Sequence, residues 1–173
     1  SSGARQHTLI DRLSLTVAKG ETVALVGESG SGKSLTARAI VGLLPARVRV
    51  VSGSIRMDGE DLASLPPHAM NAIRGRRIGM IFQQPQQMLD PTCRVGPQVV
   101  ESLRKHRDLP AAAAHTRMIQ LLREVGIADP EQRARAYAFE LSGGLAQRVM
   151  IAAALSADPD LLIADEPTTA LDV

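Results

Sequence analysis

The sequence predicts an α/β fold, built as one compact unit with an inserted lobe. Two observations predict this class. An apolar segment runs into a glycine-rich loop and then a helix, and a second apolar segment near the end of the chain stops at two carboxylates. The length of 173 residues fits one domain, and a content of 45% hydrophobic and 22% charged residues is typical of a soluble globular chain.

The first half of the chain carries three strand patterns and one helix pattern. Residues 21–27 are apolar and β-branched, end in glycine and predict a strand, and residues 33–44 place apolar side chains at helical spacing. Residues 53–59 and 77–82 each predict a further short strand.

The middle of the chain is predicted to be helical. Residues 83–97 are rich in Gln and Pro without a period, which predicts a structured loop. Helices are predicted over residues 99–106, over 111–125 with Gly126 as the stop, and over 143–157 with Ser142 as the N-cap. Residues 161–165 then predict a buried strand that ends in carboxylates.

Charge and composition exclude several classes. The 20 basic and 18 acidic residues nearly balance, and two Phe, one Tyr and no Trp leave few side chains for base stacking, so nucleic-acid binding is not supported. No stretch without Asp, Glu, Lys or Arg exceeds 12 residues, which is too short to span a bilayer. We interpret two basic clusters as solvated faces: Arg74, Arg76 and Arg77, and Arg104, Lys105 and Arg107.

The single cysteine and the two ends of the chain carry further expectations. Cys93 has no partner for an internal disulfide, and no charged-then-apolar leader is visible, so we expect a reducing, cytoplasmic setting. The sequence begins without Met and stops at Val173 directly after an acidic cluster, so we expect it to be part of a longer polypeptide.

The glycine-rich loop has the pattern G-x-x-x-x-G-K-[ST] between a predicted strand and a predicted helix. Glycines let successive N–H groups point at phosphate oxygens, the lysine reaches the β- and γ-phosphates, and the final hydroxyl ligates magnesium. An ordinary glycine-rich turn is the alternative, but this spacing and context arise rarely by chance. The predicted nucleotide contacts are Gly27, Glu28, Ser29, Gly30, Ser31, Gly32, Lys33, Ser34 and Leu35.

The acidic end of the last predicted strand supplies the second half of such a site. Asp165 is predicted to orient Mg²⁺, and Glu166 to accept a proton from the attacking water. A polar turn at the end of a strand would explain two adjacent carboxylates by itself. The phosphate loop in the same chain favours the catalytic interpretation.

Four segments in a fixed order resemble the motifs of ATP-binding cassette (ABC) ATPases. Residues 141–148, Leu-Ser-Gly-Gly-Leu-Ala-Gln-Arg, resemble the LSGGQ motif, residues 82–83 the Q-loop and residues 169–172 the D-loop, in addition to the phosphate loop. The amino-acid sequences of the phosphate loop and of residues 161–173 are similar to those of the ATPase subunits of peptide and nickel importers. The resemblance covers nearly the whole chain.

The resemblance implies an ABC ATPase core with a mostly parallel sheet and an inserted helical subdomain. Residues 1–82 would be the first part of the core, residues 83–150 the Q-loop and helical subdomain, and residues 151–173 the second part of the core. Two cassettes would enclose ATP and Mg²⁺, with Gln83 at the metal and at the attacking water. Ser142, Gly143, Gly144 and Gln147 would contact the nucleotide across the interface.

The resemblance also implies partners and a location. A second ABC subunit, integral membrane permease subunits near residues 85–97 and, indirectly, a solute-binding protein would complete an importer at the cytoplasmic face of the membrane. Among the first twenty residues only His7 is available to stack on adenine, so base recognition has no assigned residue. The family's switch histidine and the central strand that carries it are not in the sequence, so we expect this chain alone to be marginally stable and a weak ATPase.

Two other classes stay open at this stage. A soluble cassette that acts on nucleic acid or the translation machinery usually carries long coiled-coil or zinc insertions or two cassettes in one chain, and this sequence shows none of them. A P-loop kinase would need a pocket for a phosphate acceptor and has no use for the Leu-Ser-Gly-Gly segment.

Overall fold

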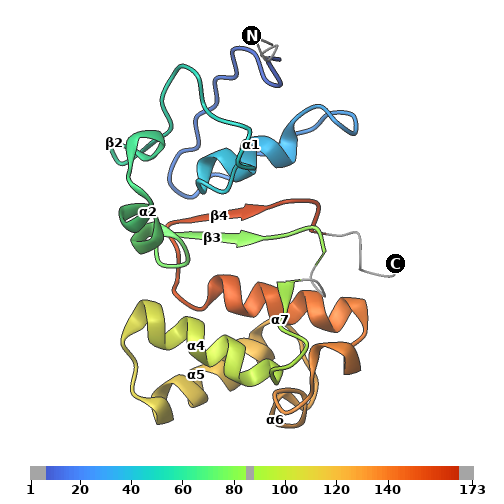
Figure 1. Cartoon of the computed structure of the whole chain (residues 1–173). Helices are drawn as coiled ribbons and strands as arrows, with labels where there is room; N and C mark the ends of the chain where they lie inside the picture. The colour runs from blue at the N-terminus through green and yellow to red at the C-terminus, as the bar shows by residue number, and fades with distance from the viewer. Residues whose placement is uncertain (1–6, 85–87, 168–173) are drawn as a thin grey trace.

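The computed structural model describes residues 7–84 and 88–167 (Figure 1). In the first half, the described chain forms a helix, a hairpin of two strands with two residues each, a short helix and a strand. Their bounds are α1 Lys33–Ile40, β1 Arg56–Met57, β2 Glu60–Asp61, α2 Pro67–Ile73 and β3 Ile78–Ile81.

Helices α4 to α7 and strand β4 follow in the described part of the chain. Their bounds are α4 Val95–Arg107, α5 Ala111–Glu124, α6 Pro130–Arg133, α7 Gly143–Leu155 and β4 Leu161–Ala164. The predicted helices at residues 33–44, 111–125 and 143–157 are confirmed, each shorter at its carboxyl end. Helix α5 ends before Gly126, whose φ of 77° fits a helix stop.

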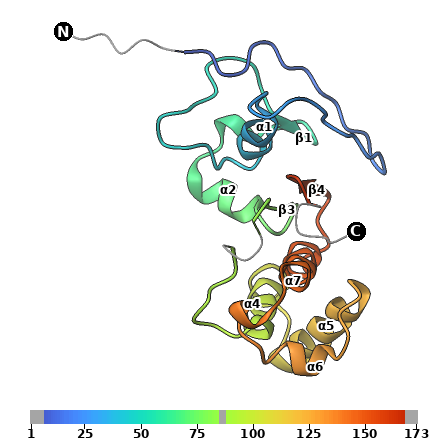
Figure 2. The same ribbon diagram turned by 90° about the vertical axis from the view of Figure 1, so that its right-hand side faces the viewer.

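The described elements form layers around a small parallel sheet. Strands β3 and β4 pair in parallel, with Ile78 opposite Leu161 and Ile81 opposite Ala164. Helix α1 lies on one side of this pair and α7 on the other, and α4, α5 and α6 lie beyond α7 (Figures 1 and 2). The strands at residues 77–82 and 161–165 are thus confirmed, and the carboxyl ends of both lie at one edge of the sheet.

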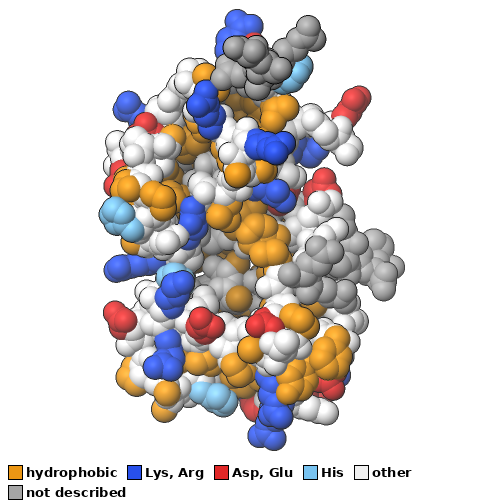
Figure 3. All heavy atoms as spheres, viewed as in Figure 1, with side chains coloured by type: hydrophobic (Ala, Val, Ile, Leu, Met, Phe, Trp, Pro, Cys, Tyr) orange, Lys and Arg blue, Asp and Glu red, His pale blue; other side chains and the backbone are white. Residues whose placement is uncertain are grey.

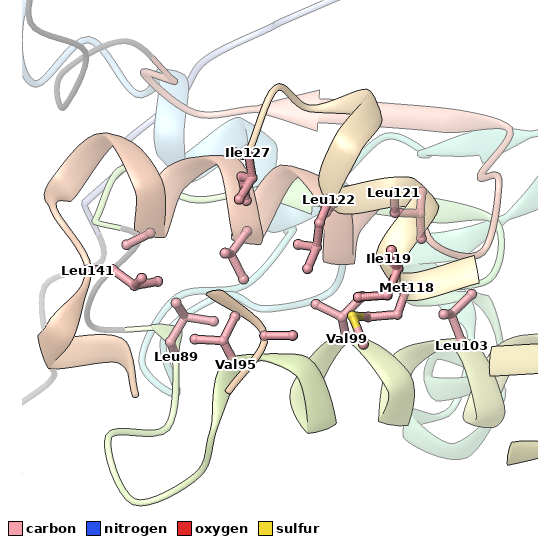
Figure 4. Packing of buried hydrophobic residues seen from close by; sticks show 14 of the residues in the cluster. Leu89, Val95, Val99, Leu103, Met118, Ile119, Leu121, Leu122, Ile127 and Leu141 are labelled. Carbon is pink, nitrogen blue, oxygen red and sulfur yellow. The ribbon is translucent and has the colours of Figure 1, made fainter. Parts of the chain in front are cut away.

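Two separate hydrophobic clusters stabilise the chain. The larger one joins α4, α5 and α7 (Figure 4), and its fully buried residues on α4 are Val95, Val99 and Leu103, four residues apart on one face of the helix. The smaller cluster lies between α1, α2 and β3 and includes Val41, Met70 and Ile78. The division of the chain at residues 82 and 150 stays a prediction, and residue 150 falls inside α7.

The strand predicted over residues 21–27 is wrong for the described structure. This segment carries no strand, and three of its apolar side chains are exposed: Val23 at 38%, Leu25 at 42% and Val26 at 91%. A strand needs a neighbour that accepts and donates its backbone hydrogen bonds, and within the described residues neither β3 nor β4 pairs with this segment. The sequence pattern indicates a propensity for extended backbone but does not specify a strand to pair with.

Two smaller predictions are also corrected. Residues 53–59 form part of a hairpin rather than one strand, because Asp58 and Gly59 both have positive φ and turn β1 back onto β2. The predicted loop over residues 83–97 ends earlier, since α4 begins at Val95 and tolerates Pro97 in its first turn. Residues 85–87 of this loop lie outside the described residues.

None of the helices in the described ranges is long and apolar enough to cross a membrane.

Candidate nucleotide site

The phosphate loop turns into α1 through two glycines with left-handed backbone. Gly30 has a φ of 81° and Gly32, the N-cap of α1, a φ of 95°, a region that residues with a side chain rarely adopt. A Cβ on Gly27 would lie 2.8 Å from the Oγ of Ser31, so that hydroxyl would have to rotate away. The shape of the loop therefore explains the glycines at positions 30 and 32.

Lys33 and the start of α1 supply the positive groups of the loop. The Nζ of Lys33 donates to the carbonyl oxygens of Gly27 and Glu28, both at 2.8 Å, which holds the ammonium against the loop. The first backbone N–H that bonds within the helix is that of Thr36, to the oxygen of Gly32 at 2.8 Å. The N–H groups of Lys33, Ser34 and Leu35 precede it, have no acceptor within α1 and suit an anion at this helix terminus.

A hydrogen bond joins the phosphate loop to the acidic end of β4 across 131 residues of sequence. The hydroxyl of Ser34 donates to the Oδ1 of Asp165 at 2.7 Å. Asp165 is only 8% exposed, and its own N–H donates to the oxygen of Ile81 at 2.9 Å, which continues the β3–β4 ladder by one residue. The sheet therefore fixes the carboxylate, and the carboxylate contacts the loop.

Gln83 and Glu166 meet beside this pair. Gln83 follows β3 and Glu166 follows β4, so both lie at the carboxyl edge of the sheet, where α/β proteins bind ligands. The Nε2 of Gln83 donates to the Oε2 of Glu166 at 2.5 Å. Glu166 has a φ of 49°, an uncommon backbone state for a residue with a side chain and one that often marks functional positions.

Three of these side chains, Ser34, Gln83 and Asp165, are the predicted ligands of Mg²⁺. Hydroxyl, carboxylate and amide oxygens are hard ligands of the kind this ion prefers, and it usually completes its shell with water and substrate phosphates. Ser34 and Asp165 are already in contact, and Gln83 and Glu166 follow the ends of the two paired strands. The residues present therefore fit the predicted metal.

The Leu-Ser-Gly-Gly segment starts α7 on the other side of the sheet. The exposed Ser142 is the N-cap, and its Oγ accepts the N–H of Leu145 at 3.3 Å, as predicted. Within the described residues, no hydrogen bond joins Ser142, Gly143 or Gly144 to the phosphate loop of the same chain. Their predicted contact with a nucleotide across an interface stays a prediction.

Gln147 lies differently from its neighbours in this segment. It is 2% exposed within α7, and within the described residues its Oε1 has no hydrogen-bond partner. A side chain buried in this way does not present its amide to a nucleotide outside the chain. The placement favours a packing role for Gln147 over the predicted nucleotide contact.

One contact at the junction of the phosphate loop and α1 was not predicted from the sequence, and one predicted segment, the D-loop, lies beyond the described residues. The hydroxyl of Thr36 donates to the oxygen of Gly32 at 3.0 Å and fixes the junction of loop and helix. A Thr four residues after the N-cap is a recognisable signal for such a bond. The predicted D-loop, residues 169–172, lies outside the described residues.

Fold and site together define a P-loop protein, in which a glycine-rich loop before a helix meets a carboxylate at the end of a parallel strand. Residues 10–169 match the profile of the family described as ABC transporter. The chain belongs to this family, and the predicted ABC ATPase fold is confirmed.

Curated relatives and a solved structure agree with this family assignment. The chain is 53% identical over 156 residues to the oligopeptide transport ATP-binding protein OppD of Bacillus subtilis, which covers 90% of this chain and 44% of that protein. It is 51% identical over 172 residues to the peptidoglycan transport ATP-binding protein YejF of Agrobacterium fabrum, covering 99% of this chain and 32% of that protein. The chain spans about a third to a half of the length of such relatives.

The solved structure is the dimeric post-hydrolysis state of the ATP-binding cassette MJ0796 bound to ADP and Pi. The TM-score is 0.81 at 31% sequence identity, over 91% of this chain and 66% of that chain. The predicted α/β core with an inserted helical part therefore corresponds to a known cassette.

Proposed function

We propose that this chain is the ATP-binding and ATP-hydrolysing part of an ABC importer. The observation that carries the proposal is the hydrogen bond between Ser34 and Asp165, because it brings the phosphate loop and the acidic strand end into one site. Two cassettes form the acting unit in this proposal, and each lends its Ser142 segment to the nucleotide held by the other. The dimeric state of the MJ0796 cassette supports this arrangement.

Each side chain of the site has one task. The N–H groups at the start of α1 and the ammonium of Lys33 bind and orient the phosphates. The oxygens of Ser34 and Asp165 would hold Mg²⁺, which would supply charge stabilisation for the phosphates. Glu166 takes the proton of the attacking water, and Gln83, within hydrogen-bond distance of Glu166, orients that water.

Peptides are the proposed cargo. The relatives include the oligopeptide protein OppD and the dipeptide transport ATP-binding protein DppD of Haemophilus influenzae, which is 48% identical over 164 residues. These names favour peptides over nickel. Permease subunits and an external solute-binding protein are the proposed partners, and the proposed location is peripheral, at the cytoplasmic face of the membrane.

Replacing Glu166 tests the hydrolytic role. In the full-length protein, Glu166→Gln should bind Mg-ATP within a few-fold of the parent and hydrolyse it about 10²-fold more slowly or worse, since general base catalysis typically contributes about 10² to 10⁴. Glu60→Gln, an exposed change on β2, is the matched control and should keep the parental rate. Hydrolysis by Glu166→Gln at the parental rate would overturn the assignment.

Copurification tests the transport role. The full-length protein should copurify with integral membrane subunits. Retention on a nucleic-acid column at physiological salt, without such subunits, would instead favour a soluble cassette that acts on nucleic acid.

A further inference from the structure

Two basic segments that lie thirty residues apart in the sequence come together in the structure. Arg76 lies in the turn between α2 and β3, and Lys105, His106 and Arg107 form the last turn of α4. They line one hollow of about 450 Å³, together with Asn71, Ala72 and Asp108. Figure 3 shows Lys, Arg and His side chains gathered at the left of the view, between the upper and lower parts of the molecule.

The hollow carries an excess of positive charge. Three of its lining residues are basic, Arg76, Lys105 and Arg107, and one is a carboxylate, Asp108. Arg107 forms an ion pair with Asp158 at 3.2 Å. Within the described part of the chain, Arg76 and Lys105 form no ion pair or side-chain hydrogen bond. The next residue after Arg76 differs, since Arg77 forms ion pairs with Asp58 and Asp160.

The usual explanation for basic residues at this place covers only part of the cluster. Cations in the last turn of a helix interact favourably with its dipole, which accounts for Lys105 and Arg107 on α4. It does not account for Arg76, which comes from a different element and faces the same hollow. Like charges brought together from two elements repel unless a counter-charge lies between them.

The turn that carries Arg76 also touches the end of α4. Gly75 has a φ of 74°, and a Cβ there would collide with the imidazole of His106. Burial lowers the pKa of His106 first, and the charges of Lys105 and Arg76 lower it further. The positive charges from both elements therefore act on this imidazole, while Asp108 is the carboxylate that lines the same hollow.

We propose that this hollow is an anion-binding site for the phosphate group of a small ligand, held by Arg76 and Lys105. A guanidinium and an ammonium are the groups that proteins use most for phosphate, the first as a planar fork and the second as a point charge. The volume lies within the range of sites for small molecules, about 300 to 1,000 Å³. Free phosphate compounds and phospholipid headgroups share this chemistry.

A phosphate in the hollow would connect the two hydrophobic clusters. Arg76 follows the helix that contributes Met70 to the smaller cluster, and Lys105 follows Leu103 of the larger one. The ligand would therefore tie the helical part to the sheet, and its binding should raise the melting temperature of the protein.

The first experiment titrates the full-length protein with pyrophosphate at constant ionic strength, with the phosphate loop saturated by Mg²⁺ and a non-hydrolysable ATP analogue. Saturable thermal stabilisation is expected. The double variant Arg76→Gln/Lys105→Gln should lose about tenfold or more in affinity. The control Arg56→Gln/Lys19→Gln removes the same charges at exposed positions elsewhere and should stay within about twofold of the parent.

The second experiment distinguishes the source of the phosphate. Vesicles of phosphatidylglycerol are mixed with the same proteins and separated by flotation. Binding that depends on Arg76 and Lys105, without a response to pyrophosphate, would assign the site to a lipid headgroup. The conservative variant Arg76→Lys keeps the charge and should retain part of the binding. Partial binding by this variant would assign the loss in the double variant to the missing charges and not to misfolding. Absence of both responses, or equal weakening by both double variants, would overturn the proposal.

Discussion

The hydrogen bond between Ser34 and Asp165 makes a quantitative prediction. Replacing Ser34 by Ala removes the donor and leaves a carboxylate that is only 8% exposed without its 2.7 Å partner. A hydrogen bond to a charged group contributes about 1.5–3 kcal/mol, and little water reaches this carboxylate to replace the hydroxyl. We therefore expect Ser34→Ala to lower the free energy of unfolding by about 1.5–3 kcal/mol in the absence of nucleotide.

Denaturant unfolding of the full-length protein measures this change, and a double-mutant cycle assigns it. Asp165→Asn removes the charge but keeps an acceptor oxygen, and combining it with Ser34→Ala gives the coupling energy between the two side chains. A coupling of about 1 kcal/mol or more is expected. Ser54→Ala, an exposed serine outside the site, is the control and should change stability by less than about 0.5 kcal/mol. Equal effects of the two Ser→Ala variants and no coupling would refute the reasoning.

Three further predictions concern binding, packing and pH. Lys33→Ala removes the ammonium from the phosphate loop and should abolish the rise in melting temperature that Mg-ATP causes, measured by a thermal shift assay. Leu103→Ala leaves a cavity at a fully buried position and should cost about 2–5 kcal/mol in denaturant unfolding, whereas Leu9→Ala, at a site 61% exposed, should cost far less. Hydrogen bonds from the hydroxyl and N–H of Thr92 lower the pKa of Asp90, so this carboxylate stabilises the fold above its ordinary pKa and the contribution is lost as pH falls through the lowered value. Thr92→Val should raise the pKa of Asp90 in an NMR titration, and an unchanged pKa would contradict that cause.

The chemistry of the nucleotide site could be predicted from the sequence because it depends on local spacing. The loop glycines, Lys33 and Ser34 are adjacent in the chain, and the helix that follows them is encoded by the next residues. The proposed role of Asp165 follows from its place at the end of an apolar strand. The hydrogen bond between Ser34 and Asp165, 131 residues apart in the sequence, is added by the structure, since the sequence assigned each residue to the metal separately.

Features that depend on tertiary packing could not be predicted in the same way. Val23 and Leu25 lie in a good strand pattern, yet strand formation requires a paired neighbour, which a pattern does not specify. Helix α2 was missed because it is seven residues long and begins at a Pro-Pro pair that is typical of a turn. Arg76 and Lys105 look like parts of two solvated clusters in the sequence, and only the structure, in which Gly75 lies against His106, shows that they face one hollow.

The distance in sequence between Ser34 and Asp165 also affects how the protein is made. Ribosomes add roughly 5–20 residues per second, so the 131 residues that separate the two positions take roughly 7 to 26 s to synthesise. During that time the nascent chain already contains its phosphate loop but not Asp165, the carboxylate of the proposed metal site. In this proposal, the growing polypeptide can hold a metal–nucleotide complex only after Asp165 has been added.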